Sequence, residues 1–341
     1  DGSLKNIQKA GLICLDRTIT LAQGYPRQSI TILARNRHAS ANPMVIEIDR
    51  TVVADLYKPD LYVLSIGVSR YQDARNNLAY ASVDARAIRD AFAQQGRLFG
   101  QIRQKLLTDA EATKDNILDA LDWIDRQTTQ RDLAVIFVSG HGINHERGGY
   151  YFLPHDTELE SLRRTGVKWL EFQDVVTHLP GKVLLLADTC HSGAILGKTR
   201  QAFGADITAA IQSITAAGTG QVIMAASTGS TASLESDEWG HGAFTKSLIE
   251  GIDGQADYNH DGIVYIRELD LYVTKRIKTL TEGRQKPTTI IPESVPDFAV
   301  GAPGHAGDGE NAGAVFIVRG GAHLESDALV NVAIARIHGE D

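Results

Sequence analysis

The chain has 341 residues, of which 43% are hydrophobic and 22% are charged. Its 34 lysines and arginines stand against 42 aspartates and glutamates, so the formal net charge is −8. These values are typical of a soluble globular protein and exclude disordered, collagen-like and coiled-coil chains. The acidic balance argues against nucleic acid as a partner, because proteins that bind it carry a basic face.

The lengths of the apolar runs and the number of cysteines exclude further classes of protein. No run approaches the roughly 18 apolar residues of a membrane span. No charged and then apolar leader follows Asp1, so we expect neither a span nor a signal peptide in this chain. The two cysteines, Cys14 and Cys190, exclude a disulfide framework and a cysteine-based zinc site. The length predicts about two domains.

The N-terminal part has the pattern of a β-hairpin. Apolar and β-branched residues over 29–34 and 45–48 predict two strands, with a polar stretch between them. They are typical of the last hairpin of a small β-sandwich. We therefore expect residues 1–57 to form a partial β-sandwich-like segment, which leaves room for further domains of a longer parent protein.

A strand–helix rhythm begins near residue 61. Four apolar runs have the pattern of strands buried on both faces of a parallel sheet, at residues 61–68, 133–138, 183–187 and 221–226. Two helical faces lie between the first runs, formed by Val83, Ala87, Ile88 and Ala91 and, after Thr113, by Ile117, Leu118, Leu121 and Ile124. Further helices are expected after Gly242 and Glu268. The pattern predicts one α/β domain over residues 58–298, with helices covering a mostly parallel sheet.

Two of the apolar runs lead into short motifs that contain reactive side chains. One run ends in Ser-Gly-His-Gly at 139–142, and another ends in Asp-Thr-Cys-His-Ser-Gly at 188–193. The glycines predict turns in which a substrate approaches the backbone closely. Because sites in parallel sheets form beyond the C-terminal ends of the strands, we expect both turns at one site.

Cysteine and histidine in these motifs suggest nucleophilic catalysis. Cys190 needs a neighbouring base to become a thiolate, and His141 supplies one that also protonates the leaving amine. The backbone N–H groups of Gly142 and Cys190, free in such turns, would stabilise an oxyanion. The alternatives are an inert buried thiol at Cys190 and a hydrogen-bonded loop histidine at His141.

These two motifs resemble the caspase-like cysteine peptidases of family C14, and in particular the bacterial metacaspase-like members. His141 lies 49 residues upstream of Cys190, close to the roughly 50 residues of caspases. Three other stretches share the resemblance, at 77–85, 151–154 and 239–245. The resemblance implies a Cys–His dyad endopeptidase that acts on proteins or peptides and requires no cofactor.

The resemblance also bears on specificity. The residues around Cys190 differ from the caspase pentapeptide, whereas Asp84 and Asp188 match the acidic pocket of metacaspases. Two carboxylates favour arginine or lysine at P1, the substrate residue before the scissile bond. The alternative for Asp84 is a charge that stabilises the N-terminus of a helix, and for Asp188 a residue that caps a turn. The alternative specificity is cleavage after aspartate.

Members of this family often cleave themselves in the loop after the nucleophile. Here that loop contains Lys198 and Arg200, which are candidate autoprocessing sites. The alternative is an ordinary solvated basic loop.

Residues 257–268 match the pattern of a twelve-residue calcium loop. Its candidate ligands are Asp257, Asn259, Asp261, the carbonyl of Ile263, and Glu268. The alternative is a polar connecting turn. The family's own calcium cluster should include an acid soon after the cysteine motif, and residues 194–197 contain none. We therefore expect calcium at 257–268 to be structural rather than required for activity.

The last residues, 299–341, resemble one FG-GAP repeat, a blade of integrin-like β-propellers that usually lie outside the cytoplasm. One such blade cannot bury its own faces. A second hypothesis follows, in which the chain is a catalytically silent interaction or adhesion scaffold. Caspase-like peptidases are commonly cytosolic, so the sequence leaves the compartment open.

Overall fold

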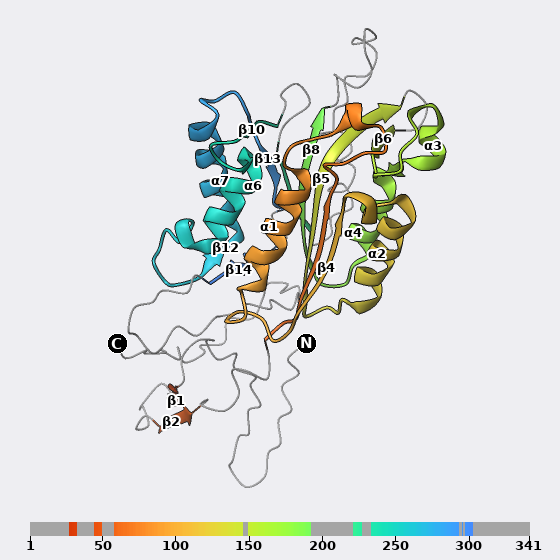
Figure 1. Ribbon diagram of the computed structural model, residues 1–341. Helices are drawn as coiled ribbons and strands as arrows, with labels where there is room; N and C mark the ends of the chain where they lie inside the picture. Colours follow the sequence, from red (N-terminus) through yellow and green to blue (C-terminus); the bar gives the residue numbers. More distant parts are fainter. Residues whose placement is uncertain are drawn as a thin grey trace, which may run out of the picture. The chain divides into compact units, whose positions relative to one another are not determined.

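The computed structural model describes residues 27–32, 44–49, 58–145, 149–191, 221–226, 233–292, 295 and 297–302 (Figure 1). The chain divides into two compact units, one formed by residues 1–54 and 320–341 and the other by 55–319. In the first unit, β1 (Arg27–Ile32) and β2 (Met44–Asp49) pair antiparallel, with Ile30 opposite Ile46. The predicted hairpin strands are therefore present. That they belong to a sandwich-like domain over 1–57 stays a prediction.

The larger unit is built on an eight-stranded, mostly parallel sheet. Six strands follow the order β13-β9-β8-β5-β3-β4, with bounds Thr288–Ile290, Gln221–Ala225, Lys182–His191, Leu133–His145, Leu61–Gly67 and Ile102–Thr108. Neighbours from β9 to β4 are parallel, and β13 is antiparallel to β9. Two short strands, β6 (Gly149–Phe152) and β7 (Val167–Lys168), extend the sheet from β5. This is the α/β fold class that the sequence predicted.

Helices cover both faces of this sheet (Figure 1). One face carries α1 (Ala81–Ala93), α6 (Ala243–Glu250) and α7 (Ile266–Leu280), and the other carries α2 (Lys114–Gln127) and α4 (Trp169–His178). The strands alternate between these layers, because successive strand side chains point to opposite faces. In β5, for example, Val135 and Phe137 join the α1 core, whereas Ile136 and Val138 join the α2 core.

Smaller elements complete the larger unit. Those outside the main sheet are α3 (Leu162–Thr165), a π-helical turn (Gly251–Gln255), 3₁₀ turns (Ala74–Asn76, Asp109–Glu111, Leu159–Ser161), and the strands β10 (Glu235–Ser236), β11 (His241–Gly242), β12 (Val264–Tyr265) and β14 (Ala299–Gly301). β14 pairs with β12, and the Ala302 N–H donates to Gln95 Oε1 at 2.7 Å. Residues 299–302, where the predicted C-terminal fragment begins, therefore pack on this unit. The remainder of that fragment lies outside the described residues.

The structure corrects two expectations about local structure. Val83 is 41% exposed, because α1 turns Asp84, Ala85 and Ile88 inward instead. Edge strand β4 was missed, since Arg103 and its polar neighbours interrupt the apolar pattern; Arg103 pairs with Asp60 at 2.8 Å. The prediction that a helix begins after Thr113 is confirmed, because the Thr113 side chain accepts a hydrogen bond from the Asn116 N–H at 3.3 Å.

None of the helices in the described part of the chain is both long enough and apolar enough to cross a membrane.

Gly67 marks a close approach between β3 and α1. A Cβ atom at this position would lie 2.2 Å from the Ala81 carbonyl oxygen and 2.6 Å from the Ala85 Cβ. We predict that Gly67→Ala lowers the free energy of unfolding by about 3 kcal/mol, as overpacking does. Urea denaturation measures this change. Gly96→Ala is the matched control, since its Cβ would meet nothing within 4 Å; an equal loss in both variants contradicts the prediction.

Candidate active site

The two predicted catalytic residues lie opposite each other on neighbouring strands. β5 and β8 pair in parallel, with His141 opposite Cys190, Ser139 opposite Asp188 and Gly142 opposite His191. The expectation of turns at these motifs is therefore wrong. β5 continues as a strand to His145 and β8 to His191, because the two motifs form ladder hydrogen bonds with each other.

His141 is held in one orientation by the loop after β3. Its Nε2 lies 2.9 Å from the Asn76 carbonyl oxygen, and its ring packs against Tyr71 with centroids 5.1 Å apart. A carbonyl only accepts hydrogen bonds, so Nε2 carries the proton and Nδ1 keeps the basic lone pair. The His141 backbone N–H also donates to Tyr71 Oη at 2.9 Å.

Burial sets the charge state of His141. Its side chain is only 7% exposed, and this burial lowers the pKa of His141 from 6.5 to about 4. The imidazole is therefore neutral near pH 7, the form that has a free ring nitrogen lone pair. Asn76 and Tyr71, which orient it, were not assigned by sequence reasoning, although the resemblance at 77–85 begins beside them.

The two predicted specificity residues meet at Gly242. A Cβ on Gly242 would lie 3.1 Å from Asp188 Oδ2 and 3.2 Å from Asp84 Oδ2. Both carboxylates are at most 4% exposed. Asp188 lies two residues before Cys190 on β8, so both positions are on the face of the sheet that α1 and α6 cover.

Specific donors hold each of these carboxylates. Asp84 accepts from His241 Nδ1 at 2.7 Å and from the Gly242 N–H at 3.2 Å. Asp188 accepts from Ser233 Oγ at 2.7 Å and from Thr245 Oγ1 at 3.4 Å. Among the described residues, no lysine or arginine forms an ion pair with either carboxylate.

Burial raises the pKa of both carboxyl groups. Burial, and then the charge of Asp84, raise the pKa of Asp188 to about 7. Burial also raises the pKa of Asp84, although the His241 hydrogen bond opposes this change. The site therefore holds negative charge that the described part of the chain does not neutralise with a fixed cation.

Glu235 is a third carboxylate that sequence reasoning missed. It lies on β10 directly opposite Gly242, and burial and the charge of Asp84 raise the pKa of Glu235 to about 7. The resemblance at 239–245 pointed to this hairpin without giving it a role. Its partner strand supplies His241 and Gly242, so the β10–β11 hairpin completes the acidic site.

Comparison with known protein families shows the family of this chain. The family model described as the caspase domain, Peptidase_C14, matches residues 61–293. This chain belongs to the caspase-domain peptidase family. It is therefore a cysteine-type peptidase, a hydrolase whose substrates are proteins.

Solved structures also match this chain. A solved structure of a protein from Geobacter sulfurreducens, a structural genomics target, is 16% identical, with a TM-score of 0.46. It covers 76% of this chain and 100% of its own. The curated proteins that were compared include no match to this chain.

Of the other predicted site residues, the autoprocessing candidates Lys198 and Arg200 lie outside the described residues. The candidate calcium loop is described, and its side chains mostly accept from backbone: Asp257 Oδ2 from Gly262 at 3.0 Å, and Asp261 Oδ1 from Ile263 at 2.8 Å. Glu268 Oε2 accepts from the Tyr265 N–H at 3.1 Å at the start of α7. Within the described residues, no three acidic, histidine or cysteine side chains gather closely enough to bind a metal.

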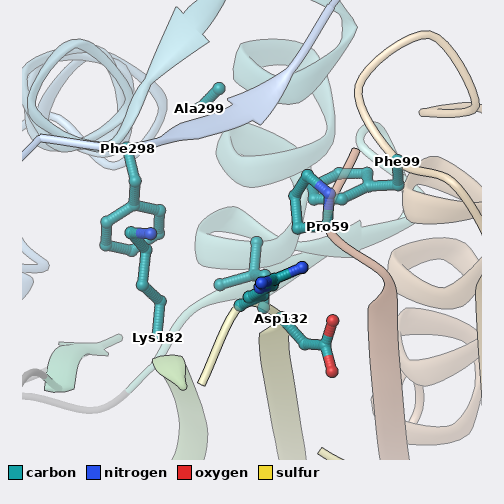
Figure 2. Close-up of a pocket in the computed structure, with 8 residues that line it drawn as sticks. Pro59, Phe99, Asp132, Lys182, Phe298 and Ala299 are labelled. Carbon is teal, nitrogen blue, oxygen red and sulfur yellow. The ribbon is translucent and has the colours of Figure 1, made fainter. Parts of the chain in front are cut away.

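A small pocket lies at the opposite end of the caspase-domain sheet (Figure 2). Leu133 and Lys182, the first residues of β5 and β8, line it together with Phe298. Burial lowers the pKa of Lys182. Because the candidate dyad is near the C-terminal ends of the same strands, this pocket belongs to the core packing rather than to the active site.

The raised pKa of Asp188 predicts a pH-dependent stability. The folded protein keeps a proton that the unfolded chain loses above its usual pKa of 3.8. This stabilisation is complete below pH 4 and disappears as pH rises through 7. From pH 5 to pH 8 the wild type should lose about 2–3 kcal/mol more unfolding free energy than Asp188→Asn. Urea denaturation at both pH values tests this, and parallel losses in the two proteins contradict it.

Proposed function

We propose that this caspase-domain protein is an endopeptidase with a Cys190–His141 dyad that cleaves after arginine or lysine. The observation that carries the proposal is the pairing of His141 with Cys190 on β5 and β8. Asp188, two residues before Cys190 on β8, converges with Asp84 of α1 at Gly242. The fold and the family support the peptidase, and the acidic site supports the choice of substrate.

In the proposed mechanism, Nδ1 of His141 takes the proton from the Cys190 thiol. The sulfur then attacks the scissile carbonyl carbon, and the carbonyl π electrons move to its oxygen. The backbone N–H groups of Gly142 and Cys190 are the proposed donors to that oxyanion. The C–N bond breaks as the imidazolium returns the proton to the leaving amine, which leaves a thioester at Cys190. Water attacks the thioester by the reverse proton path, releasing the acid and the thiol.

The acidic site supports a basic side chain at P1. Buried carboxylates whose pKa is raised by burial and repulsion are stabilised when a cation arrives. A guanidinium donates several N–H bonds in a fixed plane, so arginine suits two converging carboxylates. Lys198 and Arg200 would then be cleavable in the same way, which is the basis for proposing autoprocessing after them.

We predict that the protein hydrolyses fluorogenic peptides with arginine or lysine at P1 and not those with aspartate. Cys190→Ala should abolish hydrolysis, because it removes the nucleophile. Asp188→Asn should lower kcat/KM for the arginine peptide at least about tenfold, since it removes a charged partner. KM for this peptide should fall as pH rises through 7, because Asp188 and Glu235 ionise there.

Glu238→Gln is the charge-matched control for this experiment, because Glu238 is exposed in the turn between β10 and β11. It should keep wild-type kinetics. Cleavage after aspartate would keep the peptidase and refute the basic pocket. A wild type that cleaves no peptide, with Cys190 inert to alkylation, would favour the silent scaffold.

We also propose that residues 257–268 bind calcium as a structural ion. The observation in favour is Asp257 Oδ1, which is buried and lacks a hydrogen-bond partner among the described residues. His260 and Gly262 already adopt positive φ angles of 59° and 80°, as a tight loop requires. Asp257, Asn259, Asp261, Glu268 and the Ile263 carbonyl would supply the oxygen ligands. Binding would draw the three acidic side chains closer together than they lie in the structure.

Calcium should therefore raise the melting temperature of the wild type. A ligand at a hundred times its Kd adds about 2.7 kcal/mol to unfolding, so a shift of several degrees is expected. Asp261→Asn should reduce the shift, whereas Asp253→Asn, an exposed residue before the loop, should keep it. Calorimetry in calcium, magnesium and EDTA measures this. Identical melting temperatures in calcium and EDTA would show that the loop is only a polar turn.

A further inference from the structure

Tyr150 joins the two strands that carry the candidate dyad. It lies on β6, and its hydroxyl donates to Thr189 Oγ1 at 2.7 Å. Both side chains are buried, with exposed fractions of 6% for Tyr150 and 2% for Thr189. Since Thr189 directly precedes Cys190, this hydrogen bond ends one residue from the proposed nucleophile.

The same hydroxyl also lies against β5. A Cβ atom on Gly142 would be only 1.8 Å from Tyr150 Oη, so the hydroxyl occupies the space that a side chain would fill. Gly142 directly follows His141. One oxygen atom therefore contacts β5 and β8, in each case one residue from a member of the proposed dyad.

On β8 this contact comes from the face opposite position 190. Position 190 has the register of Leu186 in the α1 core, whereas position 189 has that of Leu185 in the α2 core, because strand residues alternate. The Tyr150 ring packs edge-on against Trp169, with centroids 5.6 Å apart. This placement lets Tyr150 act through the backbone of the two strands.

The strands need such support where they extend beyond the rest of the sheet. The pairing of β3 with β5 ends at Ser139, and the pairing of β9 with β8 ends at Ala187. Beyond those residues β5 and β8 pair with each other, and β5 pairs with β6. The sheet has lost β3 and β9 at these ends, so their geometry depends more on the contacts that β6 makes.

We propose that Tyr150 is a positioning residue, whose hydroxyl holds the extended ends of β5 and β8 together and thereby sets the distance between His141 and Cys190. This inference rests on the proposed dyad. Tyr150 lies on a third strand, β6. It would set the spacing of the dyad through its hydrogen bond to Thr189 and its contact with Gly142.

The test compares Tyr150→Phe with Tyr151→Phe. The neighbouring Tyr151 is fully buried, and its hydroxyl has no hydrogen-bond partner among the described residues. Both variants lose one buried oxygen from the same strand. Tyr150→Phe should lower kcat about tenfold with KM unchanged, because misplaced catalytic groups slow the chemical step. Tyr151→Phe should keep the wild-type kcat.

Thr189→Val removes the same hydrogen bond from its other end and keeps the side-chain shape. It should lower kcat like Tyr150→Phe, and the double variant should lose no more than either single variant. A Tyr150→Phe variant with wild-type kcat overturns the inference. So do equal losses in Tyr150→Phe and Tyr151→Phe, or additive losses in the double variant.

Alkylation of Cys190 by iodoacetamide gives a readout that does not need a peptide substrate. In a Cys14→Ser background, Tyr150→Phe should slow alkylation near pH 7 and move its pH profile upward, since the thiolate loses its aligned imidazole. An unchanged profile overturns the inference even if the wild type cleaves no peptide. Circular dichroism and urea denaturation confirm that each variant is folded, and if Tyr150→Phe unfolds, Thr189→Val tests the same hydrogen bond.

Discussion

The in-register pairing of β5 with β8 is the constraint on which the rest of the site depends. It sets His141 beside Cys190 and Ser139 beside Asp188 by backbone hydrogen bonds, before any side chain contributes. A shift of one residue would move every one of these side chains to the opposite face of the sheet. The register is maintained by apolar residues further down the strands, where Val135 and Leu184 are fully buried.

Beyond this register, the active site is a place where stability and function conflict. Asp84 and Asp188 come from different elements and converge at Gly242, and Glu235 lies opposite Gly242 on β10. Burying several carboxylates without a fixed cation costs folding free energy. Strong apolar packing on both faces of the sheet offsets this loss of folding free energy, and a bound basic side chain of the substrate would reduce it. Conflicts of this kind are characteristic of binding sites rather than of structural ion pairs.

Local patterns in the sequence predicted the frame well and its details less well. The buried strands and the Thr113 cap follow from composition and spacing within a few residues. β4 was missed because an edge strand has no need of a continuous apolar pattern. The inward face of α1 was misplaced because Asp84 is buried, and a helix that buries a carboxylate does not follow hydrophobic spacing. That carboxylate is accommodated by His241 and Gly242, about 157 positions away along the chain.

The sequence by itself determined the strand–helix rhythm, the reactive residue types and the family they resemble, because these depend on neighbours within a few positions. Only the tertiary structure decided that the two motifs are paired strands rather than turns. It also brought Glu235 to Asp84 and Asp188, and the Tyr150 hydroxyl to Thr189. These arrangements are made by hydrogen bonds and packing between residues tens to more than a hundred positions apart, and a local pattern contains no record of such partners.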